Sequence, residues 1–437
     1  MNCAWAVAAL CAVAVVLARP ARADVRNGVE VGTSWLAGDQ FVDLTPWLQF
    51  EDGPLQFGLA APVRFRVLDS DPKDSCATPG LRCQDWDTRT DWTRILRHLD
   101  WGGWSGDINV HIGDLTGITV GHGELVHRYY NNLLFDTWRT GALIEVMQPT
   151  WGLTALTGDV LQADMLALRA WGRPVTHGYW QRLRFGLQAA FDRKVGVATA
   201  PGVLGPDATP VGSGGPWQAD APLIAADLSL LVWGDDRRAL SSWFSLSGHV
   251  ADAMAVHLGT SFHRRGALAA VISLEGRYIL PIGSHTASYM PAWFGPTYEL
   301  DSHSLHNAVA SAPDRTGLAT GGTKATFELA RENGFRLVSL VDWLYDRRLD
   351  TEVWWQTNPH AQLSVRAMWF KRWHRQSASD PLDQMAYATA KLRVSDIWYA
   401  NLALGKRWRL SETFAAGQSP LHSELEVRLG FGGQWQW

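Results

Sequence analysis

Residues 423–437 have the sequence SELEVRLGFGGQWQW, in which apolar and polar positions alternate. From Leu425 onward the odd-numbered residues are Leu, Val, Leu, Phe, Gly, Trp and Trp, and the even-numbered residues from 424 are Glu, Glu, Arg, Gly, Gly, Gln and Gln. Successive side chains of a β-strand point to opposite faces. The stretch therefore predicts a strand with one apolar face and one charged or polar face.

The same alternation recurs along the chain. Clear examples are PLQFGLAAPVRFRV (54–67), RLRFGLQAAF (182–191), AAVISLEGRYIL (269–280) and AQLSVRAMWF (361–370). These segments are roughly nine to fourteen residues long, which is long for soluble strands and suits tilted strands that cross a bilayer. The pattern predicts an all-β protein whose apolar strand faces contact lipid.

Short turns and long irregular stretches separate the segments. EDG (51–53), GDD (234–236) and ENG (332–334) have turn composition, whereas 197–220 and 283–315 are long and irregular. An up-and-down membrane barrel has short turns on one side and longer loops on the other. We therefore predict a transmembrane antiparallel up-and-down β-barrel of about 16 strands, within about 14 to 18.

Two soluble architectures are the alternatives. A propeller should repeat every 40-odd residues, and the sequence shows no such repeat. A β-sandwich hides its apolar faces against a second sheet, which does not account for aromatic residues near the strand ends. Aromatic girdles at both ends of an apolar band are typical of membrane barrels.

The first residues resemble an export signal. MNCAWAVAALCAVAVVLARPARADV contains an apolar run from Ala4 to Ala18 and the small-x-small sequence Ala-Arg-Ala at 21–23. This pattern is typical of a secretory signal peptide. A membrane anchor is the alternative, but the run is short for a spanning helix. We expect cleavage of residues 1–23 and a single barrel domain over 24–437, located in the outer membrane.

Cysteine content and charge narrow the choice further. Cys76 and Cys83 remain after removal of the signal, and an exported pair in a Pro/Gly loop predicts a local disulfide. The chain carries a net charge of −4, whereas nucleic-acid binders usually have a basic excess. We therefore expect no nucleic-acid partner.

The end of the chain resembles the C-terminal signature of Gram-negative outer-membrane proteins, which the barrel-assembly machinery recognises. Phe431, Trp435 and Trp437 carry the resemblance, and Trp in place of the commoner terminal Phe is a departure from it. The resemblance implies the lipid bilayer and the assembly machinery as partners. An ordinary amphipathic edge strand is the alternative, and a homo-oligomer is left open.

The region 85–134 departs from the alternating pattern. In TDWTRILRHLDW, Trp92, Ile95, Leu96 and Leu99 have helical spacing and predict a short amphipathic helix. GITVGHGELVHRYYNNL (117–133) then resembles a segment of an uncharacterised family of Gram-negative outer-membrane β-barrels, in which a Leu-Gly-His-Gly turn precedes an Arg-Tyr-(Ser or Tyr)-Asn run. The match covers about fifty residues, and Val120 departs from it. It implies a porin-like barrel without an assigned substrate.

Two interpretations of this segment remain open. It folds into the lumen and forms a constriction, or its polar groups satisfy one another and hold a bent strand. Either way it should be internal. The residues concerned are His122, His127, Arg128, Tyr129 and Asn131.

Charged side chains on the polar faces indicate the function. Rows of arginine facing acidic residues are typical of a porin constriction. The predicted lining residues on the strands are Arg64, Arg66, Arg182, Arg184, Glu275, Arg277, Arg366, Lys391, Arg393, Glu426 and Arg428.

These residues favour a porin-like channel for passive diffusion of small polar solutes. A non-conducting scaffold barrel for envelope assembly or adhesion is the alternative, and an outer-membrane hydrolase is a third candidate. No Gly-x-Ser-x-Gly or His-Glu-x-x-His motif is present. We predict no catalytic residues, no metal and no cofactor.

Overall fold

The computed structural model describes residues 24–36, 38–69, 80–82, 85–86, 89–102, 107–132, 138–163, 165–192, 223–235, 237–249, 253–279, 320–331, 334–344, 348–358, 361–374, 384–410 and 421–436. The predicted signal peptide (1–23), Cys76, Cys83 and Trp437 lie outside these ranges. The signal peptide, the disulfide and the role of Trp437 therefore stay predictions.

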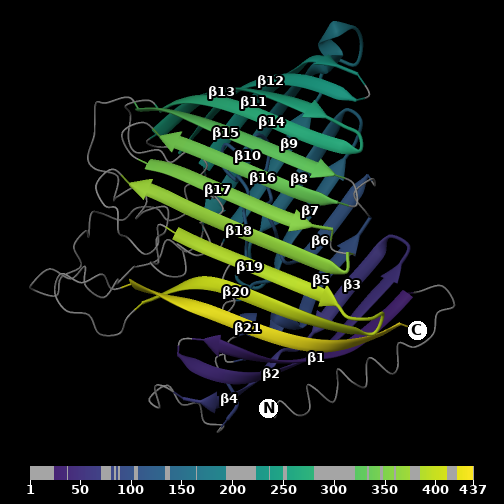
Figure 1. The fold of residues 1–437 in the computed structure, drawn as a ribbon. Coiled ribbons are helices and arrows are strands. Elements are labelled where there is room, and N and C mark those ends of the chain that lie inside the picture. The colour runs from purple at the N-terminus through teal and green to yellow at the C-terminus, as the bar shows by residue number, and fades with distance from the viewer. Residues whose placement is uncertain are drawn as a thin grey trace, which may run out of the picture.

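Antiparallel strands form a single sheet that closes on itself (Figure 1). The strands are β1 (Asp24–Leu36), β2 (Asp39–Asp52), β3 (Leu55–Ala60), β4 (Val63–Leu68), β5 (Leu96–Trp101), β6 (Ile108–Gly113), β7 (Gly141–Met147), β8 (Trp151–Thr157), β9 (Met165–Gly172), β10 (Leu183–Asp192), β11 (Leu223–Gly234), β12 (Arg238–His249), β13 (Ala253–Arg264), β14 (Leu268–Ile279), β15 (Thr320–Arg331), β16 (Phe335–Leu344), β17 (Arg348–Thr357), β18 (Leu363–His374), β19 (Gln384–Arg393), β20 (Trp398–Leu410) and β21 (Leu421–Gln436). Short helical turns are α2 (Arg89–Trp92), η3 (Thr93–Ile95) and η4 (Tyr179–Arg182).

The barrel closes between its first and last strands. β21 pairs with β20 on one side and with β1 on the other, where Phe431 lies opposite Val31. β3 and β4 pair with the second and first halves of β2, so they share one position in the wall. Pro62 lies between them, and proline has no N–H to donate to a sheet. The wall therefore has 20 strand positions.

The predicted number of about 16 strands was too low, although the all-β barrel is confirmed. Around β7, β8 and β9 the lumen-facing residues are themselves apolar, as Leu143, Leu156 and Met165 show. Apolar side chains on both faces remove the alternation from which strands are recognised. The region 85–134, set apart as irregular, also contributes β5 and β6 to the wall.

The predicted amphipathic helix is shorter than its spacing suggested. Only Arg89–Trp92 is α-helical, and the 3-10 turn Thr93–Ile95 follows it. Leu96 and Leu99 belong to β5, where Leu99 pairs with Phe57 of β3. Strand pairing across the wall therefore overrides the local helical spacing.

The two ends of the barrel differ in the length of their connections. One end has the connections from β2 to β3, β11 to β12, β13 to β14 and β19 to β20, each of two to four residues, and we call it the short-turn end. The other end has the connections over 193–222 and 280–319, and we call it the long-loop end. Short turns face the periplasm in outer-membrane barrels.

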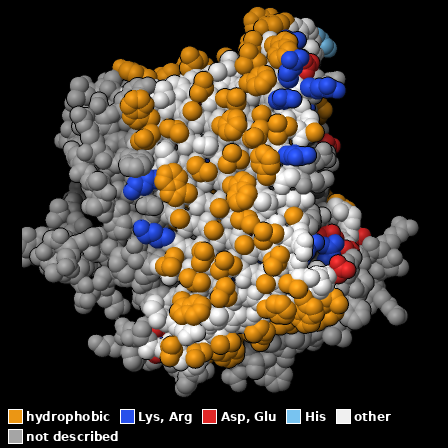
Figure 2. Space-filling model, in the orientation of Figure 1, with side chains coloured by type: hydrophobic (Ala, Val, Ile, Leu, Met, Phe, Trp, Pro, Cys, Tyr) orange, Lys and Arg blue, Asp and Glu red, His pale blue; other side chains and the backbone are white. Residues whose placement is uncertain are grey.

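The outer surface of the wall is apolar. In β21, Leu425 is 69% exposed whereas Glu426 is 4% exposed, so the alternation of the sequence does separate an outer face from an inner one. Leu187, Leu258 and Leu274 are exposed on other strands, and hydrophobic side chains are spread over the wall in Figure 2. Among the described residues, no helix is long and apolar enough to span a bilayer. A closed sheet with an apolar exterior and charged interior is an outer-membrane β-barrel.

Candidate functional site

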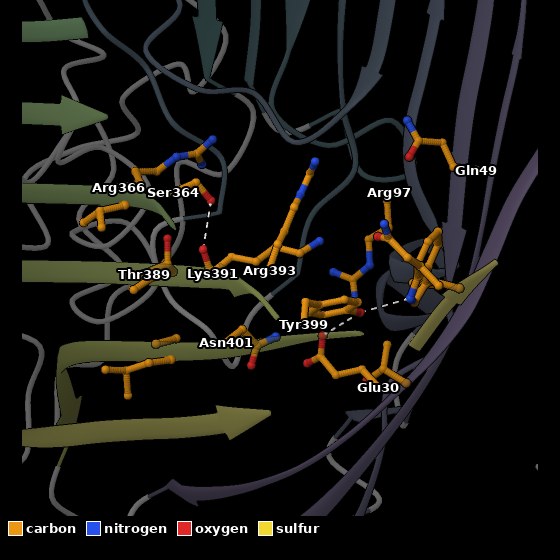
Figure 3. A pocket seen from close by; sticks show the side chains of 18 of the residues that line it. Glu30, Gln49, Arg97, Ser364, Arg366, Thr389, Lys391, Arg393, Tyr399 and Asn401 are labelled. Carbon is orange, nitrogen blue, oxygen red and sulfur yellow. Dashed lines mark hydrogen bonds between the residues drawn. The ribbon is translucent and has the colours of Figure 1, made fainter. Parts of the chain in front are cut away.

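A vestibule of about 1060 Å³ lies inside the barrel near its short-turn end (Figure 3). β1, β2, β3, β5 and β17–β21 contribute its lining. The basic lining residues are Arg26, Arg97, Arg366, Lys391, Arg393 and Arg428, and the acidic ones are Glu30, Glu51 and Asp396. The vestibule therefore has an excess of positive charge.

Tyr399 organises one side of this vestibule. Trp47 Nε1 donates a hydrogen bond to the Tyr399 hydroxyl at 3.2 Å, and that hydroxyl donates to Glu30 Oε2 at 3.3 Å. Lys391 Nζ lies 3.9 Å from the centre of the Tyr399 ring, within range of a cation–π contact. These contacts fix a lysine and a carboxylate on β19 and β1, on either side of one aromatic ring (Figure 3).

A second, narrower cavity of about 200 Å³ adjoins the vestibule. Arg97, Arg366, Tyr387 and Arg428 line both, so the two spaces meet at these side chains. The remaining residues of the narrow cavity are Pro62, Arg64, Arg94, Asp114, Thr116, Tyr130, Asn132, Trp138 and Met368. Asp114, Thr116, Tyr130 and Asn132 belong to the chain segment between β6 and β7, so the cavity lies between that segment and the barrel wall. We call the narrow cavity the passage.

Five arginines and one carboxylate line the passage. Three of the arginines have acidic partners: Arg64 is 3.1 Å from Asp85, Arg94 is 3.2 Å from the same carboxylate, and Arg428 is 3.4 Å from Asp43.

Arg97 and Arg366 differ from these three. No carboxylate of the described residues lies within 4 Å of either guanidinium, and that of Arg97 instead lies 4.5 Å from the centre of the Trp138 ring. Asp114 is the one carboxylate among the described lining residues of the passage and forms no ion pair with either arginine, so the passage keeps an excess of positive charge.

The segment that narrows the lumen runs from Asp114 to Asn132, between β6 and β7; we call it the inward segment. Its two arms pair through Ile118 and Tyr129. Asn131 holds its base, because its Oδ1 accepts from the Leu115 N–H at 2.7 Å and its Nδ2 donates to the Gly113 carbonyl at 2.9 Å. The Asn131 side chain thus forms hydrogen bonds with backbone groups that have no partner strand where the chain leaves the wall.

Apolar contacts hold the inward segment against one side of the wall. Leu115, Val120, Leu125, Val126 and Tyr129 form a buried cluster with residues of β7–β11, namely Leu143, Leu156, Met165, Ala167, Ala190, Leu223 and Ala225. This cluster fills that side of the lumen. The open space is therefore left on the opposite side, beside β4, β5, β18, β19 and β21.

Ion pairs attach the same segment to the rest of the wall. Arg128 Nε donates to Glu352 of β17 at 2.6 Å, and Arg128 also donates to the Tyr130 hydroxyl at 2.7 Å. His122 stacks on Trp243 with ring centres 4.7 Å apart and lies 3.5 Å from Asp227. The inward segment therefore contacts the wall at β17 and also at β11 and β12.

The tip of the inward segment needs glycine. Gly121 has φ +68°, and a Cβ there would lie 2.3 Å from Gln188 Nε2. Gly123 has φ +84°, and a Cβ there would lie 2.4 Å from His127 Nδ1. Left-handed backbone and close approach together exclude any side chain.

Of the predicted lining residues, five line the cavities. Arg64 lines the passage, Lys391 and Arg393 line the vestibule, and Arg366 and Arg428 line both.

The five residues predicted on the irregular stretch all lie on the inward segment, but none of them lines either cavity. Tyr129 and Asn131 are buried in its packing, and Arg128 is held by Glu352. Both ring nitrogens of His127 are buried and have no hydrogen-bond partner in the described part of the chain. Apart from His127, these residues therefore hold the inward segment in place.

The other predicted residues lie elsewhere in the interior or at its edge. Arg277 pairs with Asp342, and Glu275 lies 2.7 Å from Lys324 on the neighbouring strand, so these charges pair within their own wall. Arg66 pairs with Asp39, Arg184 stacks on Trp171 and Glu426 is buried. Arg182 lies on η4, ahead of β10, and its guanidinium lies over Tyr179.

Sequence patterns missed Arg94 and Arg97 in the passage. Both fall in the stretch whose spacing indicated a helix, and Arg97 lies where the β3–β5 pairing shifts register between Gly58 and Leu59. An irregular pairing breaks the alternation that would have assigned Arg97 to the lumen. Tyr387 and Tyr399 were missed because the prediction of lining residues concentrated on charge.

Three side chains on β12, β13 and β14 have the order of a serine-hydrolase triad. Ser247 Oγ is 2.8 Å from His257 Nε2, and His257 Nδ1 is 2.9 Å from Glu275 Oε1. Ser247 is 2% exposed and lines neither cavity. Lys324 shares the Glu275 carboxylate. A nucleophile needs space for a substrate, so we interpret this network as support for the wall. No group of three His, Cys, Asp or Glu residues in the described ranges could hold a metal ion.

Comparison with known proteins gives distant structural neighbours. No protein-family model matches the chain, and no curated protein sequence matches it. The solved structures it is similar to include OccK11 (OpdR) of Pseudomonas aeruginosa, with 10% identity, a TM-score of 0.33 and coverage of 95% of this chain and 96% of the other. Wzi of Escherichia coli, described as a carbohydrate-binding β-barrel involved in group 1 capsule assembly, has 12% identity, a TM-score of 0.33 and coverage of 95% and 85%. OccAB3 of Acinetobacter baumannii has 8% identity, a TM-score of 0.32 and coverage of 96% and 100%.

Proposed function

We propose that this outer-membrane barrel is a porin-like channel for passive diffusion of small polar solutes, with a preference for anions. The observation that carries the proposal is the junction of the vestibule with the passage at Arg97, Arg366 and Arg428. A solute that enters from the short-turn end meets this junction before it reaches the inward segment.

The sizes of the two spaces support a channel for small solutes. The vestibule of about 1060 Å³ can hold a hydrated organic molecule, whereas the passage of about 200 Å³ admits only small ones. The passage is bounded on one side by Asp114, Thr116 and Asn132 of the inward segment. The segment thus forms one boundary of the route.

The charges of the route support anion preference. Arginine rings select for anions in narrow pores, because they replace part of the hydration of the permeating ion. Low-dielectric walls concentrate the field of such charges along the axis. Arg97 and Arg366 contribute most, since the described residues place no carboxylate within ion-pair distance of them.

A closed scaffold barrel is the second candidate, and one observation favours it. The buried cluster around Leu125 and Tyr129 packs against β7–β11 and fills the lumen there with apolar side chains. In a closed scaffold barrel, the arginine-lined passage would be a polar cavity that does not continue to the long-loop end.

Planar bilayer recording distinguishes the two functions. A channel gives stepwise conductance, and in a KCl gradient its reversal potential takes the sign expected for chloride. The absence of conductance from folded protein at all voltages would overturn the channel and favour the scaffold. A cation-selective reversal potential would overturn the anion preference alone.

A further inference from the structure

We propose that the outer rim of the barrel at the short-turn end of β11–β13 binds the phosphate of an anionic phospholipid, through Arg238 and Arg264 beside Trp233. This inference concerns the lipid-facing surface, so it does not depend on whether the lumen conducts.

The side chains of Arg238 and Arg264 belong to the lipid-facing side of the wall. In β12, Trp243 and Ser245 are buried whereas Phe244 is 43% exposed, so even-numbered residues point outward. Arg238 has the same parity as Phe244. In β13, His257 is buried and Leu258 is exposed, so Arg264 also points outward. A guanidinium at such a position must reach the level of the lipid headgroups.

The two arginines lie directly opposite each other. Arg238 and Arg264 are register partners in the β12–β13 pairing. Side chains opposite each other on antiparallel strands have Cβ atoms about 5 Å apart, and like charges there destabilise the pair. An anion placed between them would convert that repulsion into two attractive contacts, and a phosphate suits the planar donors of two guanidinium groups.

Nearby residues compensate only part of this charge. Asp235 lies 3.4 Å from Arg238, and both side chains are exposed to solvent. In the part of the chain that the structure describes, the Arg264 guanidinium has no hydrogen-bond or ion-pair partner. The turns after β11, β13 and β15, together with the strand residues next to them, carry in the sequence Arg237, Arg238, Arg264, Arg265 and Arg331 against Asp235, Asp236 and Glu332. Lys and Arg side chains gather at this edge of the wall in Figure 2.

An aromatic side chain completes the site. Trp233 is 44% exposed on β11, and the Arg238 guanidinium lies 5.3 Å from the centre of its ring. Tryptophan favours the boundary between acyl chains and headgroups. Trp233 therefore places the arginine pair at the depth of the phosphate. A headgroup with a net negative charge suits the site better than a zwitterionic one. The positively charged amine of a zwitterionic headgroup would lie close to the arginines and be repelled by them.

Native mass spectrometry of the detergent-solubilised protein with added lipid tests the proposal. The wild type should retain phosphatidylglycerol in preference to phosphatidylcholine of the same chain length. The R238Q/R264Q variant should bind phosphatidylglycerol roughly 20-fold more weakly, as expected for loss of two charges at an anionic surface, and R264Q alone roughly 5-fold more weakly. Binding of phosphatidylcholine should not change.

R173Q is the matched control. It removes one exposed arginine from the same end of the barrel, but that guanidinium lies over Trp171, whose ring is buried in the interior. Its affinity for phosphatidylglycerol should equal that of the wild type. The proposal is overturned if the wild type does not discriminate between the two lipids, or if R264Q, folded as judged by its migration on unboiled gels, retains full affinity.

Discussion

Arg128 and Glu352 join the inward segment to the far wall of the barrel. Arg128 Nε lies 2.6 Å from Glu352 Oε1, and the Tyr130 hydroxyl donates to the same oxygen at 3.2 Å. Both charged side chains are buried. The pair connects residues 224 positions apart in sequence, and it fixes the segment that bounds the passage.

Breaking this pair should destabilise the protein. Arg128→Met leaves the Glu352 carboxylate buried without its cation, and removal of one partner of a buried ion pair costs about 3–5 kcal/mol. The loss should appear in the free energy of unfolding from urea titration in detergent micelles. R128M/E352M should recover part of it, since no uncompensated charge remains.

The Arg336–Glu328 pair is the control. Its two atoms lie 2.8 Å apart, but the Arg336 side chain is 53% exposed. R336M should therefore cost no more than about 1 kcal/mol. Equal losses in R128M and R336M would contradict the role assigned to Arg128.

Neutralising Arg97 and Arg366 should change ion selectivity. R97Q/R366Q should lower the ratio of chloride to potassium permeability by about 30-fold, because each of the two charges removed contributes roughly 1 kcal/mol near an ion in a water-filled pore. The reversal potential in a KCl gradient measures this ratio. R173Q, which lines neither cavity, should leave it unchanged. An unaltered ratio in R97Q/R366Q would show that ions take another route.

The tip of the inward segment should tolerate no methyl group. Gly53, in the turn between β2 and β3, also has a positive φ, +55° against +68° at Gly121, but a Cβ would meet Gln188 only at Gly121 and nothing within 4 Å at Gly53. G53A should therefore cost about 1–2 kcal/mol for the positive φ alone. G121A should cost more, because Gln188 also donates to Glu124 at 2.8 Å and cannot move freely. Urea titration of both variants measures the two losses in free energy of unfolding. Equal losses would mean that the tip of the inward segment rearranges to accommodate the methyl group.

The sequence predicts the barrel wherever lumen-facing side chains are polar. In β21 and β14 the alternation of Leu425 with Glu426, and of Leu274 with Glu275, identifies both faces correctly. It fails around Leu143 and Leu156, because the inward segment makes the lumen apolar there. It also fails at Arg97, where the strand register shifts. Neither cause is local, so no pattern in a single segment reveals it.

Removing Asp235 should strengthen the proposed lipid contact. Asp235 neutralises part of Arg238, and the backbone N–H groups of Arg237 and Arg238 donate to its carboxylate at 2.8 and 2.7 Å. These hydrogen bonds hold the pKa of Asp235 below its usual value. D235N should raise the affinity for phosphatidylglycerol a few-fold at pH 7.

The same pKa direction predicts how the wild type responds to acid. Because the lowered pKa keeps Asp235 ionised, its compensation of Arg238 persists until the pH falls below the ordinary range of aspartate, about 3.9. The affinity of the wild type for phosphatidylglycerol should therefore stay constant from pH 7 to about pH 4.5. Native mass spectrometry across that range measures it. A wild-type affinity that rises toward the D235N value already between pH 7 and 5 would contradict the assignment of Asp235 as the ionised partner of Arg238.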